Sequence, residues 1–262
     1  MKDILSEIIA HKRQEVDKQK KLLHIKEIEK RIESQSFEPY SLREALLSSP
    51  HGIIAEFKRK SPSKLWINQH ADASVIPLEY QTNGASAISV LTDETYFGGT
   101  ITDLEQTIAS TSIPVLRKEF IVDEYQIYES KMHGAHAILL IAAALSPYQC
   151  KEFTKTAMDL GLDVLLELHD ETEIDYISPL NNIIGVNNRN LGSFVTDVSK
   201  SHQMINQLPT EAVLVSESGI SDAKTIYELR QVGYRGFLIG ENFMKTKHPG
   251  QTLQQFIKDI HE

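Results

Sequence analysis

Eight short apolar runs alternate with segments of helical period from residue 53 onward, and this alternation constrains the fold more than any other feature of the sequence. Continuously apolar strands separated by amphipathic helices are typical of a parallel sheet covered by helices. Eight such units favour an α/β fold of the closed (β/α)8 type, a TIM barrel, over an open doubly wound sheet, although one miscounted strand would reopen the choice. The runs are IIAEF (53–57), AISVL (87–91), PVLRK (114–118), AILLIA (137–142), DVLLEL (163–168), IIGVN (183–187), AVLVS (212–216) and GFLIG (236–240).

The segments between the runs have helical period, and several end in a glycine that suits a C-terminal helix cap. Ahead of the first run, residues 2–34 carry apolar residues at helical spacing with one break, which predicts two amphipathic helices. We therefore expect one barrel domain over residues 1–262, with residues 1–48 as an N-terminal helical extension within it. The helical segments are 75–84, 101–110, 124–134, 148–161, 171–177, 198–208, 222–233 and 251–262, and the capping glycines are Gly84, Gly134, Gly161 and Gly233.

Charge and composition narrow the class of protein. The net charge of −9 argues against a nucleic-acid binder or a membrane-surface protein, because both need a basic face. No run approaches the ~20 apolar residues of a membrane span, and the N-terminus lacks the apolar core of a signal peptide. Cys150 is the only cysteine, so an internal disulfide is ruled out, and we expect a cytoplasmic protein with an unreactive thiol at this position.

Polar residues cluster where the apolar runs end. In a barrel the active site forms at the carboxyl ends of the strands and in the loops that follow them. Because side chains alternate along a strand, Lys118 shares a face with Leu116, and Glu167 shares a face with Leu165, so both charges are expected to point inward. The polar and glycine positions at these ends are Glu56, Lys58 and Ser61, then Lys118, Glu167, Asn187 and Arg189, then Glu217, Ser218 and Gly219, and finally Gly240 and Glu241.

Each of these residues, taken alone, is as well explained by a surface charge or a salt bridge as by a site. A ring of them is different, because burying charged groups costs several kcal/mol each unless they are well paired. Cations beside carboxylates suit an anionic substrate together with a proton donor and acceptor. We expect neighbouring cations and desolvation to lower a lysine pKa and burial to raise a glutamate pKa. The glycines after the last two runs are expected to leave backbone N–H groups free for phosphate.

Motifs for other chemistries are absent. The ten histidines form no HxxxH or HxH pair, and His136 and His169 are expected to pack or to face solvent. The sequence also has no GxSxG elbow, P-loop or GxGxxG fingerprint. We therefore expect no metal and no cofactor, and a small-molecule phosphorylated substrate.

Seven segments together resemble the indole-3-glycerol phosphate synthase family of tryptophan biosynthesis. The resemblance runs from the N-terminal helices to the eighth apolar run. It implies a (β/α)8 barrel with extra N-terminal helices. The implied reaction closes the indole ring of 1-(2-carboxyphenylamino)-1-deoxyribulose 5-phosphate, with release of carbon dioxide and water. The segments are IIAEFKRKSPSKLWI (53–67), SVLTD (89–93), PVLRKEFIVDEYQI (114–127), LLELHD (165–170), GVNNRNL (185–191), VSESGI (215–220) and LIGENFM (238–244).

The resemblance also implies roles. Lys118 resembles the principal general acid for ring closure, and Lys58 resembles the residue that contacts the substrate carboxylate and assists the acid–base steps. Glu167 resembles the acid/base of dehydration, and Glu56 a carboxylate that orients neighbouring groups. The remaining positions resemble substrate-binding residues: Asn187 and Arg189 in an ion network, Glu217 and Ser218 in the wall, Phe120 against the aromatic ring, and Ser61, Gly219, Gly240 and the Glu241 backbone N–H around the phosphate.

Two positions depart from the family pattern. Leu65 stands where glycine is usual after SPSK, which puts the motion of that loop and the rate of product release in doubt. Glu119 stands where aspartate is more usual after the lysine, and we expect little effect from one extra methylene.

Other functions remain open at this stage. A sugar-phosphate isomerase barrel such as phosphoribosylanthranilate isomerase shares the phosphate loops but is expected to place a cysteine or aspartate at the strand ends. A Schiff-base aldolase could use Lys118 or Lys58. A catalytically silent scaffold of the same fold would be expected to lack an acid–base residue. A monomer is expected, with a homodimer as the alternative, because an amphipathic N-terminal helix can cover its own barrel or a neighbour's.

Overall fold

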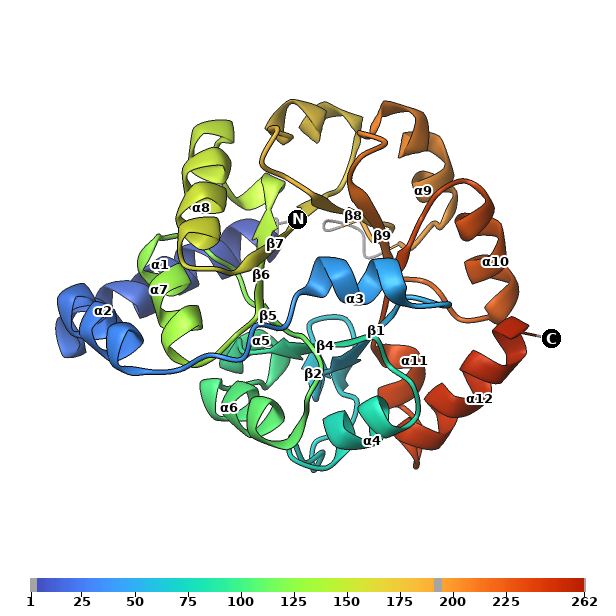
Figure 1. Ribbon diagram of the computed structural model, residues 1–262, viewed down its shortest axis with the longest axis horizontal. Helices are drawn as coiled ribbons and strands as arrows, with labels where there is room; N and C mark the ends of the chain where they lie inside the picture. Colours follow the sequence, from blue (N-terminus) through green and yellow to red (C-terminus); the bar gives the residue numbers. More distant parts are fainter. Residues whose placement is uncertain (1–3, 191–194, 262) are drawn as a thin grey trace.

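Eight parallel strands close into a barrel in the computed structural model, which describes residues 4–190 and 195–261 (Figure 1). Each strand is hydrogen-bonded to the next along the chain, and the last pairs with the first. The expected (β/α)8 barrel is therefore confirmed, and each observed strand matches its predicted run to within one residue at either end. The strands are β1 (Ile53–Phe57), β4 (Ala87–Leu91), β5 (Val115–Lys118), β6 (Ala137–Ile141), β7 (Asp163–Leu168), β8 (Ile183–Asn187), β9 (Val213–Glu217) and β10 (Gly236–Ile239).

Helices surround the barrel and alternate with its strands (Figure 1). Each of the four expected glycine caps has a positive φ, between 70° and 119°, which confirms the capping prediction. The segment 171–177 is a 3₁₀ helix, η2 (Glu171–Tyr176), because only a few residues separate its cap Asp170 from Pro179, which ends any helix before it. The helices are α4 (Ile76–Thr82), α6 (Ile101–Ser110), α7 (Tyr125–Met132), α8 (Pro147–Asp159), α9 (Ser199–Met204), α10 (Ala223–Gln231) and α12 (Pro249–His261).

The N-terminal extension contains three helices. Two were expected, α1 (Ile4–Leu22) and α2 (Ile25–Ser34), which are separated at His24, and α2 packs against α7. The third, α3 (Leu42–Ser48), lies across the centre of the barrel in Figure 1 and packs against β4 and β9. Other short elements were also too brief for periodicity to reveal: β2 (Lys60–Ser61), β3 (Leu65–Trp66), α5 (Glu94–Phe97), η1 (Ala142–Ala144), η3 (Ile205–Gln207) and α11 (Glu241–Met244).

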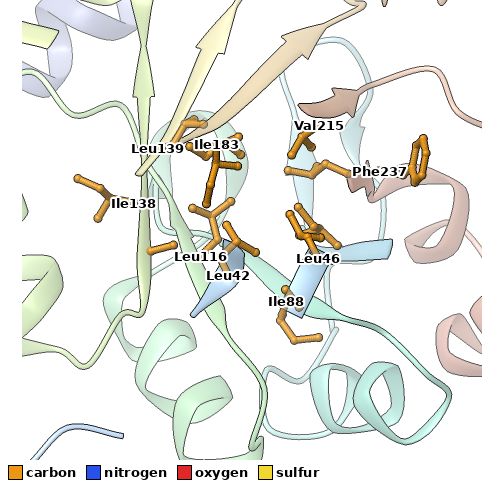
Figure 2. Packing of buried hydrophobic residues seen from close by; sticks show 14 of the residues in the cluster. Leu42, Leu46, Ile88, Leu116, Ile138, Leu139, Ile183, Val215 and Phe237 are labelled. Atoms are coloured by element: carbon orange, nitrogen blue, oxygen red, sulfur yellow. The ribbon is translucent and has the colours of Figure 1, made fainter. Parts of the chain in front are cut away.

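The barrel interior is filled from the N-terminal end by apolar side chains. Leu42 and Leu46 of α3 pack beside the inward-pointing Leu116 and Val215, and α3 thereby closes this end (Figure 2). Ile138, on the other face of its strand, points away from the interior (Figure 2).

Strand alternation arranges the inward side chains in layers of four from alternate strands. The deepest of the strand layers described here is apolar, and the third layer is charged. From the N-terminal end, the layers are Ile54, Leu116, Leu165 and Val215; then Ser89, Leu139, Gly185 and Leu238; then Glu56, Lys118, Glu167 and Glu217; then Leu91, Ile141, Asn187 and Gly240.

Candidate active site

A cavity of about 270 Å³ opens at the carboxyl ends of the strands. The predicted site residues converge on it: all of them line the cavity except Glu217, which lies below it with its side chain in contact with Lys118. The wall also contains residues that no sequence pattern identified, because they come from the N-terminal helix and from a short helix after β4. These are Ile4, Leu5 and Ile8 of α1, and Phe97 of α5, whose ring lies 5.8 Å from that of Phe120.

Lys118 lies at the centre of the charged layer. Its Nζ donates a hydrogen bond to Glu217 Oε2 at 2.8 Å and lies 3.5 Å from Glu167 Oε2 and 3.8 Å from Glu56 Oε2. The three carboxylates are buried, at 0 to 4% exposure. Branched apolar side chains dominate such interior layers in most TIM barrels. Here the layer instead consists of one lysine surrounded by three glutamates.

The charged layer sets its own protonation states. Burial opposes the Lys118 ammonium, but the three carboxylates outweigh burial and raise its pKa. The expectation of a lowered lysine pKa is therefore wrong for Lys118, because carboxylates outnumber cations around it. Burial would raise the pKa of Glu56, yet Lys58 and Lys118 lower it below the usual value. The expectation that burial raises a glutamate pKa holds for Glu217: burial and the charge of Glu167 raise its pKa to about 8 despite Lys118.

Two glycines make room for the glutamates of this layer. A Cβ on Gly185 would lie 2.2 Å from Glu217 Oε1, and a Cβ on Gly240 would lie 2.4 Å from Glu56 Oε1. Any larger residue would displace the carboxylate that it faces. Gly240, predicted only as a phosphate position, therefore also shapes the layer beneath the cavity.

Lys58 extends the charged layer to the cavity rim. It lies two residues beyond Glu56 on the same face, and its Nζ donates to Glu56 Oε1 at 2.5 Å. Glu56 thus bridges the two lysines, since its other oxygen faces Lys118.

A second group of charges lies at the mouth of the cavity. Lys64 Nζ donates to Glu241 Oε1 at 2.6 Å, while the Arg189 guanidinium donates to Ser63 Oγ at 3.2 Å and lies 3.9 Å from Glu241 Oε2. Ser61 is buried between this group and the charged layer. Lys64 and Arg189 are cations that an anionic group entering the mouth would meet first.

The turn after β9 has an unusual backbone. Ser218 and Gly219 both have left-handed φ, 67° and 79°, and a left-handed serine is a strained conformation of the kind that concentrates at functional sites. Asn188 holds this turn, donating from Nδ2 to Ser216 Oγ at 3.0 Å and to the Ser218 carbonyl at 3.1 Å. Asn187 itself fixes the neighbouring loop, because its Oδ1 accepts the Arg189 N–H at 3.0 Å. The last residue of the predicted GVNNRNL segment, Leu191, lies outside the described residues.

The residue after Lys118 ties the site to the N-terminal extension. Glu119 accepts hydrogen bonds from Thr92 Oγ1 and from the Phe120 N–H, both at 2.8 Å. Lys12 of α1 is buried, and its Nζ lies 3.2 Å from Glu119 Oε1 and 3.0 Å from Asp93 Oδ2. No sequence pattern pointed to Lys12, although a lysine on the apolar face of an amphipathic helix is a signal that could have done so. The segment that follows β5, from Glu119 to Phe120, is thus anchored by a cation from the extension.

His169 packs in the interior, which is one of the two expected alternatives, and it also contacts a predicted site residue. Its ring is buried, and its Nε2 lies 3.0 Å from Glu167 Oε1. His136 packs at the opposite end of β6, where its Nδ1 accepts the Val115 N–H at 3.1 Å. Cys150 is buried in α8, and burial raises the pKa of its thiol to about 12, as expected for an unreactive side chain.

Within residues 4–190 and 195–261, no group of His, Cys, Asp or Glu is arranged to hold a metal ion. In the same part of the chain, no helix has the length and apolar character needed to cross a membrane.

Known proteins match this chain over nearly its full length. The family model described as indole-3-glycerol phosphate synthase matches residues 5–256. An indole-3-glycerol phosphate synthase of Bacteroides thetaiotaomicron is 54% identical over 260 residues, covering 99% of this chain and all of the relative. One from Aliarcobacter butzleri is 41% identical over 257 residues, covering 97% of this chain and 98% of the relative.

Solved structures with the same fold are more distant in sequence. A tryptophan synthase complex from Pyrococcus furiosus superposes with a TM-score of 0.58 at 12% identity, covering 81% of this chain and 98% of that one. A mutant tryptophan synthase α-subunit from the same organism gives a TM-score of 0.58 at 13% identity, over 80% of this chain and 98% of the other. At this identity the likeness concerns the fold alone.

Proposed function

The chain belongs to the indole-3-glycerol phosphate synthase family, the decarboxylating, ring-closing lyases of tryptophan biosynthesis, and we propose that Lys118 is the general acid of its reaction. The observation that supports this role is the Lys118 ammonium at the centre of the charged layer, held by three carboxylates at the bottom of the cavity. Two related enzymes more than 40% identical over almost their whole length support the same reaction for this chain.

In the first step, the arene carbon that bears the carboxylate attacks the ketone carbon of the substrate. The carbonyl oxygen gains charge as the new C–C bond forms, and Lys118 donates a proton to it. The raised pKa of Lys118 suits this task, because the ammonium is present at neutral pH and the developing alkoxide is more basic than an amine. The fixed carboxylates hold the ammonium in place, so little reorganisation accompanies proton transfer.

Loss of carbon dioxide then restores the aromatic ring, and dehydration completes the indole. Dehydration needs an acid to protonate the departing hydroxyl group and a base to take a proton from the adjacent ring carbon. Glu167 is the proposed base, because Lys118 and His169 overcome the effect of burial and lower its pKa, which keeps it ionised. Lys58, at the rim on the same face as Glu56, contacts the substrate carboxylate and assists the acid step, and Glu56 orients both lysines.

Substrate binding divides between a cationic mouth and an apolar wall. The phosphate lies near Ser61, the left-handed turn at Ser218 and Gly219, and the first turn of α11, where Gly240 and the Glu241 N–H are found. Arg189 and Asn187 position the sugar chain, and Glu217 fixes Lys118 from below. Phe120 supports the aromatic ring, with Phe97 beside it.

The alternatives fit this site less well. A Schiff-base lysine needs an amine that is neutral at working pH, whereas three carboxylates favour the charged form of Lys118. An isomerase built on a cysteine is disfavoured because Cys150 is buried in α8, away from the cavity. As a biosynthetic enzyme, the chain is further proposed to act in the cytoplasm and to form one barrel domain. It is also proposed to be a monomer, which light scattering on the purified protein would test.

The test is indole fluorescence after mixing the protein with 1-(2-carboxyphenylamino)-1-deoxyribulose 5-phosphate. Lys118→Met is expected to lose ~10²–10⁴-fold in kcat, the usual contribution of a positioned general acid. Lys155→Met, an exposed lysine of α8, is the matched control and is expected to retain wild-type activity. A folded wild-type protein without activity would refute the reaction, and an active Lys118→Met variant would refute the role of Lys118.

A further inference from the structure

Glu167 has a different partner on each of its two oxygens. Oε2 faces the Lys118 ammonium at 3.5 Å, and Oε1 faces His169 Nε2 at 3.0 Å. Glu167 and His169 are 3% and 7% exposed. The carboxylate proposed as the base of dehydration therefore lies between the Lys118 ammonium and the His169 imidazole, with one oxygen facing each.

His169 is itself held by a second carboxylate. Glu173 Oε2 accepts the backbone N–H of His169 at 2.5 Å and lies 3.7 Å from the ring Nδ1. Glu173 belongs to η2, and the side chain of Asp170 caps this helix by accepting the Thr172 N–H. The local fold therefore fixes the imidazole between two buried carboxylates, Glu167 and Glu173.

We propose that His169 is a positioning residue for Glu167: its imidazolium, anchored by Glu173, holds the carboxylate from the side opposite Lys118. Without it, Lys118 would be the only cation within ion-pair distance of Glu167 among the described residues, and movement of Lys118 during proton donation would release the base. This inference rests on the proposed role of Glu167 in dehydration.

The charges around the pair support a protonated imidazole. Burial opposes the charge, but Glu167 and Glu173 outweigh it and raise the pKa of His169 to about 9. The groups around the pair are Lys118 of β5, Glu56 of β1, Glu217 of β9, Lys200 of α9 and Asp170, the cap of η2. The ring of His169 itself lies against two carboxylates, those of Glu167 and Glu173, so a positive charge on the ring is favoured.

The test compares pH profiles of the wild type and His169→Asn. The variant is expected to lose about tenfold to a hundredfold in kcat near pH 6, a part of what a positioned base contributes, with KM within about twofold. The deficit should shrink as pH rises toward 9, because Glu167 of the variant ionises at higher pH and the wild-type imidazolium loses its proton. A purely structural defect would lower kcat by the same factor at every pH.

Two further variants complete the experiment. Glu173→Gln keeps the acceptor for the His169 backbone N–H but removes the charge that anchors the imidazolium. We therefore expect a smaller loss of kcat with the same pH trend. If His169→Asn does not fold, the Glu173→Gln variant tests the proposal in its place. His133→Asn, which removes an imidazole paired with the exposed Glu105, is the matched control and should behave as the wild type. Unchanged kcat, or a loss independent of pH, overturns the proposal. An inactive wild type would instead overturn the proposed function.

Discussion

Replacing Lys12 by methionine tests whether the N-terminal extension holds the segment that directly follows Lys118. The Lys12 ammonium lies 2.9 Å from Glu15, 3.0 Å from Asp93 and 3.2 Å from Glu119. Glu15 is one-third exposed and can turn to water after the substitution, whereas the side chains of Asp93 and Glu119 are only 1% and 3% exposed. Methionine fills much the same volume, so the loss concerns charge more than packing.

The expected loss of unfolding free energy arises because the buried carboxylates of Asp93 and Glu119 lose their ion pair with Lys12. Removing one partner of a buried ion pair costs about 3–5 kcal/mol. Asp93 keeps the Tyr96 N–H. Glu119 keeps Thr92, the Phe120 N–H and the Arg117 guanidinium, which lies 3.8 Å from Glu119 Oε2, so we expect the lower end of that range. Despite burial, the carboxylates raise the pKa of Lys12, so its contribution is complete at pH 7 and is lost only above the ordinary lysine value of 10.5. For a chain of this size, 3 kcal/mol corresponds to a fall of about 6–12 °C in Tm.

Urea denaturation and thermal melting at pH 7 measure the effect. Lys18→Met, at an exposed position of the same helix, is the control and should stay within about 0.5 kcal/mol of the wild type. Adding Glu119→Gln to Lys12→Met should recover at least ~1 kcal/mol, since the two residues interact directly. A loss below about 1 kcal/mol for Lys12→Met, or the absence of recovery in the double variant, would refute the reasoning.

Three other predictions concern single positions. Gly185→Ala places a methyl group against Glu217 Oε1, so the Glu217 carboxylate must move away from Lys118. We expect kcat to fall by at least about tenfold. An undiminished kcat in the fluorescence assay would contradict this. Leu65 has a φ of 49°, a left-handed conformation that costs an L-residue roughly 1–2 kcal/mol. Glycine avoids this cost, but the larger conformational entropy that it loses on folding cancels about half of the gain. Leu65→Gly should therefore raise the unfolding free energy by about 0.5–1 kcal/mol, and a lower Tm would count against it. Because the pKa values of Glu217 and His169 are raised to about 8 and about 9, the stability that their protonated forms provide is complete below their ordinary pKa values and is lost as pH rises through 8 and 9. The contribution of Glu217 to stability should then fall between about pH 4.5 and pH 8, and that of His169 between about pH 6.5 and pH 9. Glu217→Gln should make the first of these falls disappear in urea titrations at several pH values.

Much of the barrel could be predicted because each strand is specified locally. Alternation along a strand places Lys118 on the face of Leu116 and Glu167 on the face of Leu165, and this needs no knowledge of distant residues. The short elements α3 and α5 escaped prediction because four to seven residues are too few to define a period. Their positions depend on burial against the finished barrel.

The contacts that tune the site could not be predicted, since they join segments that are distant in the sequence. Lys12 meets Asp93 and Glu119 only after α1 has docked, and the direction of the Lys118 pKa depends on three carboxylates from three other strands. A pattern can predict that a lysine points inward, but the balance of charges around it is a property of the closed barrel. His169 differs, because its partners Glu167 and Glu173 lie close to it in the sequence.

The charged layer stabilises the reaction more than it stabilises the fold. In that layer, three buried carboxylates face Lys118, and one of them also pairs with Lys58 at the rim. With three carboxylates ionised against two lysines, the group carries one excess negative charge before an anionic substrate arrives. Apolar residues of similar size would often stabilise a buried position as well or better. The stability of the barrel is therefore expected to come mainly from apolar packing, which includes the layer below, Leu42 and Leu46 of α3 at the far end, and the outer faces of the strands against the helices. Burial and the charge of Glu167 raise the pKa of Glu217 despite Lys118, and a proton on this carboxyl group removes the excess negative charge.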